Sequence, residues 1–319
     1  MAILTLGETP IPIAEGQTVL AALLAAGVDA PYSCRAGLCH TCLHQVIEGT
    51  VPEASQAGLS DAQKAQGYFM PCVCVPKEPL KIVRAGDLHG EIEVRVAAID
   101  RLSHNVIRLC LEPDRTFAYR PGQFIALRAP GEVIRTYSIA SHPALDAFIE
   151  LHVRVIPGGK MSGFIAERLA RGDRLKISNP AGTCFYEGAD PERPIVLAGA
   201  GTGLAPLWGI ARDAIEQRHR GPIRLYHGAR ERSGLYLVDE LQALADRHES
   251  FSYRPCVLSD SEPGAGDLAA TVAGAETDPA NTDFFLCGDA DLVGRLKREL
   301  YLKGAKLQRL RADSFVPAA

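Results

Sequence analysis

Four cysteines place the strongest constraint on what this chain can fold into. Cys34, Cys39 and Cys42 follow the spacing C-x4-C-x2-C, and Cys72 comes after 29 intervening residues. Two irons and two sulfides need four thiolates, and three clustered cysteines with one distant cysteine is the ligand spacing of a 2Fe-2S cluster. A structural zinc site also takes four thiolates, but it usually presents them as two tight pairs. We therefore expect a 2Fe-2S cluster held by these four cysteines.

The segments CRAGLCHTC and GYFMPC resemble plant-type ferredoxins over roughly the first 85 residues. That family often has glycine where His40 stands, a departure that leaves the ligands intact. Cys74 competes with Cys72 as the fourth ligand. The 29-residue gap and the preceding Tyr68-Phe69-Met70 favour Cys72, with Cys74 as a buried neighbour. The resemblance implies a plant-type 2Fe-2S ferredoxin domain.

Composition excludes several partners. A formal net charge of −4 provides no basic field for nucleic acid or an anionic membrane. The N-terminal sequence lacks a basic segment followed by a long apolar stretch, and the longest apolar run, around 19–28, is far below a membrane span. Nine cysteines, an odd number, fit metal ligation in a reducing compartment better than a disulfide framework. We expect a cytoplasmic protein with no nucleic-acid or membrane partner.

The hydrophobic pattern changes twice along the chain. The first segment mixes short strands with a helix at 18–26. From 91 to 179, short strands punctuated by Gly and Pro are typical of an antiparallel barrel, with one helix at 161–169. From 194 onward, strands at 195–198, 223–226, 251–257 and 284–287 alternate with helices at 206–217, 237–247 and 290–303. We expect a multidomain chain: an α+β β-grasp ferredoxin domain (1–88), an antiparallel β-barrel flavin domain (89–188) and an α/β parallel-sheet nucleotide-binding domain (189–319).

Two short motifs in the barrel segment suit a flavin. Arg135-Thr136-Tyr137-Ser138 is placed at the start of a strand, and residues 158–162, GGKMS, open a helix about 20 residues later. An arginine can pair with a phosphate, an aromatic side chain can pack on a flat ring, and a strand hydroxyl can bond a ring nitrogen. Glycines at a helix N-terminus expose amides to a pyrophosphate. Taken alone, the first motif is typical of an ordinary strand and the second of an ordinary turn.

In this order the motifs resemble the flavin-binding barrel of the ferredoxin-NADP reductase superfamily. The later segment PAGTCF, residues 180–185, resembles the same family's PxGxF turn. Members with this domain order mostly use FAD, whereas relatives with the ferredoxin at the other end use FMN, so we expect FAD. The resemblance implies flavin contacts from Arg135, Tyr137, Ser138, Gly159, Met161 and Ser162.

A glycine-rich turn, GAGTGLAP at 199–206, joins a buried strand to a helix. This arrangement places helix N-terminal amides at the carboxyl end of a parallel sheet, where a dinucleotide pyrophosphate binds. The turn resembles the superfamily's nicotinamide motif, which implies contacts from Gly199, Gly201, Thr202 and Gly203.

Two segments near the C-terminus complete this resemblance. Cys287-Gly288-Asp289 stands where the family has CGPP, which implies that Cys287 lies beside the nicotinamide, although a buried apolar filler is an equal reading of this cysteine. Asp313-Ser314-Phe315 resembles the family's acidic-x-aromatic ending, in which the aromatic ring lies against the flavin. The resemblance implies that Ser138, Cys287 and Asp313 position or polarise the reacting pair.

The sequence distinguishes NADH from NADPH less clearly than it identifies the nucleotide-binding turn. Many NADH-using relatives have an aspartate where Gly234 stands, an acid that binds the ribose diol and repels a 2′-phosphate. Arg230, Arg232 and Ser233 offer groups that receive such a phosphate, and a solvated charged turn is an equal reading of them. We expect nucleotide contacts from these residues, with NADH as the donor and NADPH as the alternative.

The whole chain resembles the three-domain reductases, ordered ferredoxin, FAD and NAD, of bacterial aromatic-ring dioxygenases and multicomponent monooxygenases. The resemblance implies hydride transfer from NADH to FAD, then single electrons through the 2Fe-2S cluster to an oxygenase component or an intermediary ferredoxin. A reductase with the same relay for another acceptor, such as a sugar-deoxygenation enzyme, remains open. A redox-sensing or docking protein without turnover would not need the nucleotide turn. A self-sufficient oxygenase is disfavoured because no segment remains for a haem or non-haem iron site.

Overall fold

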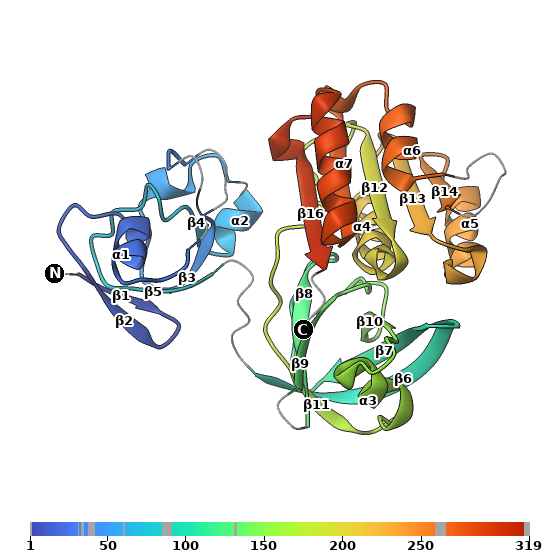
Figure 1. Cartoon of the computed structure of the whole chain (residues 1–319), viewed down its shortest axis with the longest axis horizontal. Helices are drawn as coiled ribbons and strands as arrows, with labels where there is room; N and C mark the ends of the chain where they lie inside the picture. The colour runs from blue at the N-terminus through green and yellow to red at the C-terminus, as the bar shows by residue number, and fades with distance from the viewer. Residues whose placement is uncertain are drawn as a thin grey trace. The chain divides into compact units, whose positions relative to one another are not determined.

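The computed structural model describes residues 2–30, 32, 35–37, 42–59, 61–84, 91–130, 133–258 and 266–315. By its internal contacts the chain divides into two compact units, Met1–Asp87 and Leu88–Ala319. Figure 1 shows the helices and strands of both units. No helix in the described ranges is long and apolar enough to cross a membrane.

The first unit is a five-stranded mixed sheet with one helix packed on it. The strand order is β2-β1-β5-β3-β4, with β1 parallel to β5 and the other pairs antiparallel. Thr18 caps the helix, because its side chain accepts a hydrogen bond from the amide of Ala21, and the helix buries its apolar face against the sheet. This is the expected β-grasp arrangement. The elements are β1 (Ala2–Leu6), β2 (Thr9–Ile13), α1 (Val19–Ala25), β3 (His44–Glu48), η1 (Glu53–Gln56), α2 (Asp61–Ala65), β4 (Tyr68–Phe69) and β5 (Leu80–Arg84).

The second unit begins with a six-stranded antiparallel sheet in the order β10-β7-β6-β11-β8-β9. Alternation is clearest in β6, where Ile92, Val94 and Val96 are buried and the residues between them are exposed. A bridge between Ile139 and Leu151 joins the two outer strands, so the sheet closes as a barrel. The elements are β6 (Ile92–Ser103), β7 (Val106–Pro113), β8 (Phe124–Ala129), β9 (Val133–Ser138), β10 (Ile149–Arg154), α3 (Lys160–Glu167) and β11 (Arg174–Ile177).

The rest of the second unit is a parallel sheet in the order β14-β13-β12-β15-β16 with helices on both faces. Alternate residues of β12 pack toward α4 and α5 on one face and toward α6 and α7 on the other, and Figure 1 shows α7 in front of the sheet and α4 behind it. The elements are β12 (Ile195–Ala200), η2 (Gly201–Gly203), α4 (Leu204–Glu216), β13 (Ile223–Ala229), η3 (Arg232–Gly234), α5 (Val238–Arg247), β14 (Phe251–Val257), α6 (Leu268–Ala275), η4 (Pro279–Asn281), β15 (Asp283–Asp289), α7 (Ala290–Leu302), η5 (Leu307–Arg309) and β16 (Leu310–Phe315).

The expected fold classes are confirmed, and some local predictions need correction. The segment Arg135-Thr136-Tyr137-Ser138 ends β9 rather than starting a strand, because β9 pairs with β8 in a hairpin from Val133 onward. Ser138 is therefore the last residue of its strand rather than an early one. In the last segment the helix α6, the strand β16 and the short 3-10 helices were not expected.

Candidate functional site

A hydrogen bond joins the flavin barrel to the last strand of the parallel sheet. Ser138, the final residue of β9 and a buried side chain, donates through Oγ to Oδ2 of Asp313 on β16, at 2.6 Å. Desolvation of the Asp313 carboxyl raises its pKa, and the hydrogen bond from Ser138 works in the opposite direction. The structure thus brings together two of the three residues to which the sequence assigns a catalytic role.

Cys287, the third of these residues, lies beside Asp313 in the parallel register of β15 and β16. Its side chain is fully buried, and its sulfur is 3.9 Å from the sulfur of Cys184. Burial raises the pKa of Cys287 well above its ordinary value, and the contact with Cys184 and the nearby Asp313 add to the shift. Cys287 is therefore a protonated thiol rather than a thiolate. Its contact with Cys184 was missed, although Cys184 lies within the PAGTCF turn that the sequence singled out.

The glycine-rich turn packs directly on the backbone of Cys287. A Cβ on Gly199 would lie 2.6 Å from the carbonyl oxygen of Cys287, and a Cβ on Gly203 would collide with the same carbonyl. Gly201 has a φ of +56°, which side chains rarely adopt. The turn, with the half-buried Thr202, forms η2, which continues directly into α4, because the amide of Leu204 donates to the carbonyls of Gly201 and Thr202. The amides suited to a pyrophosphate are therefore those at the start of η2, which has no side-chain cap and no acidic residue in its first turn.

The other motif residues of the barrel lie at the end of β9 and the start of α3, which pack against each other. Burial raises the pKa of Tyr137 to about 12, so its hydroxyl stays protonated. The Arg135 guanidinium donates to the carbonyl of Ile134 at 2.7 Å. Tyr137 offers an apolar ring with a polar tip, and Arg135 a charge near the same strand end.

The start of α3 fits a second phosphate-binding turn. Gly159 is the N-cap residue without a side-chain hydrogen bond, and the first turn contains no acidic residue. Met161 and Ser162 are buried, and Ser162 Oγ accepts from the amide of Ile156 at 3.1 Å, which leaves its hydroxyl proton for another acceptor. These uncapped amides and this hydroxyl suit the pyrophosphate of FAD.

Arg230, Arg232 and Ser233 lie on an exposed turn that follows β13. Ala200 at the end of β12 is paired with Gly228 of β13, so this turn and the glycine-rich turn emerge at the same edge of the sheet. Phe315 ends β16 opposite Asp289. Asp289 itself accepts from the amide of Leu292 and caps α7, a structural role that the sequence analysis did not assign.

The predicted cluster ligands are described in part. Cys34 and Cys39 lie outside the described residues, whereas Cys42 and Cys72 are buried in one hydrophobic cluster. A Cβ on Gly37 would lie 3.2 Å from the Val73 side chain, so Gly37, which stands between Cys34 and Cys39 in the sequence, meets the turn that carries Cys72. This approach fits a group held by the four predicted ligands.

Two neighbours of these ligands are also placed by the structure. Cys74 is completely buried, and its carbonyl accepts from the amide of Val19 at 2.8 Å. His44, which the sequence analysis overlooked, bonds through Nδ1 to the carbonyl of Cys42 at 2.9 Å. A histidine two residues after a predicted ligand cysteine was the signal that the sequence offered.

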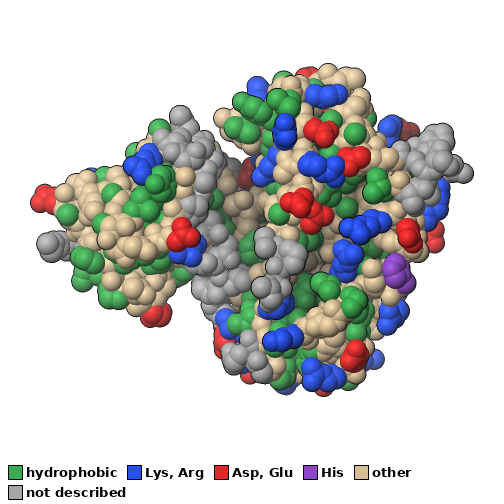
Figure 2. All heavy atoms as spheres, in the orientation of Figure 1, with side chains coloured by type: hydrophobic (Ala, Val, Ile, Leu, Met, Phe, Trp, Pro, Cys, Tyr) green, Lys and Arg blue, Asp and Glu red, His purple; other side chains and the backbone are tan. Residues whose placement is uncertain are grey.

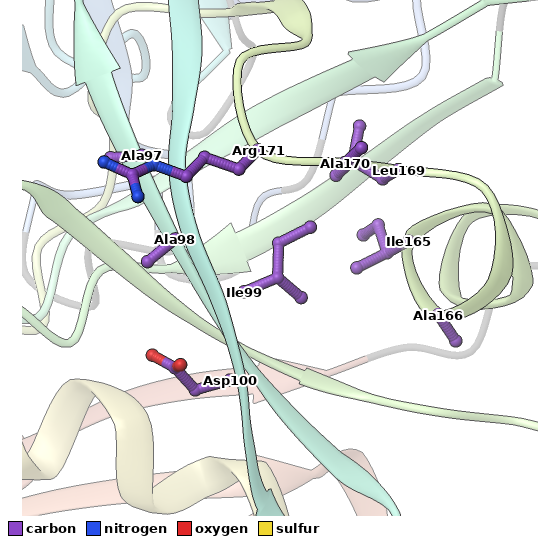
Figure 3. Close-up of a pocket in the computed structure, with 9 residues that line it drawn as sticks. All are labelled: Ala97, Ala98, Ile99, Asp100, Ile165, Ala166, Leu169, Ala170 and Arg171. Carbon is purple, nitrogen blue, oxygen red and sulfur yellow. The ribbon is translucent and has the colours of Figure 1, made fainter.

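A shallow groove on the barrel lies apart from these residues. It measures about 430 Å³ and is lined by strand residues 97–100 and by the end of α3 with the following turn. Figure 3 shows Ile99 and Ile165 on its two sides and the Arg171 side chain extending toward β6. It contains none of the predicted site residues. On the face drawn in Figure 2, acidic and basic side chains are interspersed over the larger unit.

Comparison with known proteins assigns the three segments in order. A 2Fe-2S iron-sulfur cluster binding domain matches residues 5–77, an oxidoreductase FAD-binding domain matches 93–186, and an oxidoreductase NAD-binding domain matches 197–297. The reductase subunit of an aromatic O-demethylase from Amycolatopsis sp. is 30% identical, over 99% of this chain and 98% of that protein. The chain belongs to the three-domain ferredoxin/FAD/NAD reductases. This reductase is accordingly an NAD(P)H-dependent oxidoreductase with 2Fe-2S, FAD and NAD domains.

Two further similarities extend over the whole reductase. The ferredoxin--NAD(P)(+) reductase component of a Pseudomonas putida naphthalene 1,2-dioxygenase system is 30% identical over 96% of each chain. The crystal structure of an Amycolatopsis cytochrome P450 reductase covers all of both chains with a TM-score of 0.71 and 29% identity. The reductase therefore transfers electrons from NAD(P)H through FAD to a 2Fe-2S cluster.

Proposed function

We propose that the reductase oxidises NADH and delivers single electrons to an oxygenase component, directly or through an intermediary ferredoxin. The observation that carries this proposal is the link between Ser138 and Asp313, which joins the flavin barrel to the strand beside Cys287. The glycine-rich turn packs on that same cysteine. Flavin and nicotinamide motifs from segments far apart in the sequence therefore converge on one place. The similarity to the reductase component of a naphthalene 1,2-dioxygenase system supports an oxygenase component as the acceptor.

We assign binding and orientation to the chain's own groups. The glycine-rich turn, with Gly199 and the η2 residues Gly201, Thr202 and Gly203, holds the nucleotide pyrophosphate, and the uncapped amides of α3, with Gly159, Met161 and Ser162, hold the flavin pyrophosphate. Arg135 and Tyr137 contact the flavin, and Phe315 covers its ring. When bound, FAD accepts a hydride and releases electrons singly to the cluster, which carries one at a time.

Ser138, Cys287 and Asp313 orient the reacting atoms. The hydroxyl of Ser138 is a donor that serves either Asp313 or a flavin ring nitrogen, and the half-buried carboxyl of Asp313 sets the local charge. Cys287 presents a neutral, buried sulfur that excludes water from the nicotinamide ring. Each of the three therefore acts by position and polarity, without a covalent step.

We further propose the ligand set and the boundaries of the parts. Cys34, Cys39, Cys42 and Cys72 hold the cluster, with Cys74 as a buried neighbour, and the domains extend over 1–88, 89–188 and 189–319. We also propose a cytoplasmic location, because an odd number of cysteines, nine, fits metal ligation in a reducing compartment better than a disulfide framework. Arg230, Arg232 and Ser233 lie at the adenosine end of the nucleotide.

The function is tested by following electrons to successive acceptors. Anaerobic NADH should bleach the flavin absorbance, and cytochrome c, a one-electron acceptor, should then be reduced only by protein that contains the cluster. Purified oxygenase component should form hydroxylated product in proportion to the NADH consumed. NADH that leaves the flavin oxidised would favour a sensing or docking protein. A tenfold or greater preference for NADPH would contradict the choice of donor.

A further inference from the structure

The turn that follows β13 is held from outside its own domain. Residues 230–236, called the ribose turn here, connect β13 to α5 and carry the exposed Arg230, Arg232 and Ser233. Two side chains of the flavin barrel reach it, His104 from the hairpin between β6 and β7 and His152 from β10. Both contacts join residues more than 80 positions apart in the sequence.

The first contact is on the surface. His104 lies with Nδ1 at 2.9 Å from the carbonyl oxygen of Ser233. Because a carbonyl only accepts, Nδ1 carries the proton and donates it. The hairpin that presents His104 is itself fixed, since Arg101 donates to the carbonyl of His104 and the amide of Val155 donates to the carbonyl of Asn105. The backbone of the hairpin is therefore fixed where the His104 ring can donate to the carbonyl of Ser233.

The second contact is buried. The hydroxyl of Tyr236 is 3.1 Å from Nδ1 of His152, whose Nε2 is 2.7 Å from Oε1 of Glu150. The Glu150 carboxylate only accepts, so Nε2 donates to it, and Nδ1 lies within hydrogen-bond distance of the Tyr236 hydroxyl. The Tyr236 ring also packs edge-on against His152 and against His227 of β13. Tyr236 is thus fixed in position by His152 of the barrel and by His227 of β13.

The backbone between these contacts and α5 is strained. Leu237, which follows Tyr236, has φ 53° and ψ 29°, a left-handed conformation that costs a residue with a Cβ about 1 kcal/mol. No side chain caps the start of α5. Local sequence therefore does not favour this conformation, and the burial of Tyr236 and Leu237 must maintain it.

We propose that the flavin barrel sets the affinity for the dinucleotide by holding the ribose turn in its binding conformation, with His104 and the Tyr236–His152 pair as positioning residues. The proposal rests on the assignment of Arg230, Arg232 and Ser233 to the adenosine end of the nucleotide. Neither histidine touches the nucleotide in this scheme. Without them the turn is free to move, and binding must include the cost of ordering it.

Binding of NAD+ and NADP+ to the oxidised, FAD-loaded full chain tests this, by isothermal titration without turnover. His104→Ala removes the donor to Ser233 and should weaken NAD+ binding about three- to tenfold. His104→Asn places an amide donor near the position of Nδ1 and should restore affinity to within about twofold. Tyr236→Phe, which keeps the ring but removes the hydroxyl, should weaken binding by a similar factor. In steady state these changes should raise KM for NADH and leave kcat unchanged.

Two further variants separate the possible outcomes. His248→Ala removes a histidine at the end of α5 that has no described partner for its side chain, and it should leave NAD+ affinity unchanged. Arg232→Ala removes a residue that is expected to contact the nucleotide. Unchanged NAD+ affinity in His104→Ala with weakened affinity in Arg232→Ala would overturn the positioning role of the barrel and leave the nucleotide assignment intact. Unchanged affinity in both variants would overturn the nucleotide assignment and, with it, the positioning role. Loss of FAD from His104→Ala, or an equal effect of His248→Ala, would show a general structural effect and overturn the positioning role.

Discussion

Ser138 and Asp313 are joined by a 2.6 Å hydrogen bond across 175 positions of sequence. The bond links the terminal residue of a barrel strand to the last strand of the parallel sheet, and Cys287 lies beside Asp313 in register. A donor to a carboxylate contributes more than a neutral hydrogen bond does. Four predictions test this site and other parts of the protein.

Ser138→Ala should slow flavin reduction by NADH about ten- to a hundredfold, the loss expected for one hydrogen bond to a charged group. The carboxyl of Asp313 loses its donor, so its pKa should rise further. Anaerobic stopped-flow absorbance measures the rate directly. Ser141→Ala is the matched control, because this buried serine bonds Tyr119 and the amide of Glu150 but not Asp313. Equal slowing in both variants would count against a specific role for Ser138.

Cys72→Ser should abolish the visible absorbance and the electron paramagnetic resonance signal of the reduced cluster. Cys74→Ser should keep both signals, because Cys74 is a fully buried residue of the core. Reduction of the flavin by NADH should persist in both variants, since it takes place in the other unit. If only Cys74→Ser lost the cluster, Cys74 would be the fourth ligand and Cys72 the buried neighbour.

Gly203→Ala should disrupt the glycine-rich turn. Its new Cβ would meet the carbonyl of Cys287 and lie 3.0 Å from the amide nitrogen of Gly288, and neither group is a flexible side-chain end. We expect NAD+ affinity to fall at least tenfold, roughly 1.4 kcal/mol, with FAD retained. Gly294→Ala is the control, because this helical glycine in α7 has open space around it and should gain up to about 1 kcal/mol of stability. Titration with NAD+ and thermal unfolding measure both effects.

His227 should make the stability of the larger unit depend on pH. Burial, with nearby His152, lowers the pKa of His227 from 6.5 to about 3. Below pH 6.5 the unfolded chain binds a proton here that the folded chain does not. The free energy of unfolding should therefore fall by up to about 1.4 kcal/mol per pH unit as the pH drops toward 3. Above pH 6.5 this contribution is constant.

Urea unfolding followed by the fluorescence of Trp208, the single tryptophan, at pH 7, 6 and 5 measures this dependence. His227→Gln should reduce the slope with pH, whatever its effect on stability at pH 7. His248→Gln leaves His227 in place and should keep the slope. An unchanged slope in His227→Gln would mean that other groups dominate the acid sensitivity.

Local signals predicted the three-part architecture because each part carries its own period and turn residues. The barrel strands alternate as β6 does, and β12 and β15 each contain a short apolar run followed by glycine or a helix. The strand β16 was missed because Leu310–Phe315, LRADSF, has neither an apolar run nor a clear alternation. It forms because β15 offers a free parallel edge.

Other parts of the site were beyond local reasoning. The helix α6, LAATVAGA, has no polar face from which to read a period, although Asp267 before it is a good cap that accepts from the amides of Ala269 and Ala270. The contacts Ser138–Asp313, Cys184–Cys287 and His104–Ser233 each depend on how distant segments pack. The motifs predicted which residue types form the site, and only the tertiary structure showed which residues their side chains contact.

The pairing of β1 with β5 has a consequence for how the protein is made. These strands lie at the centre of the first sheet, and residue 4 pairs with residue 80. All five strands of that sheet have therefore left the ribosome by the time residues just after Arg84 have emerged. The ferredoxin unit can fold and receive its iron and sulfide while the flavin barrel is still being synthesised, so cluster loading and flavin loading can follow one another during translation.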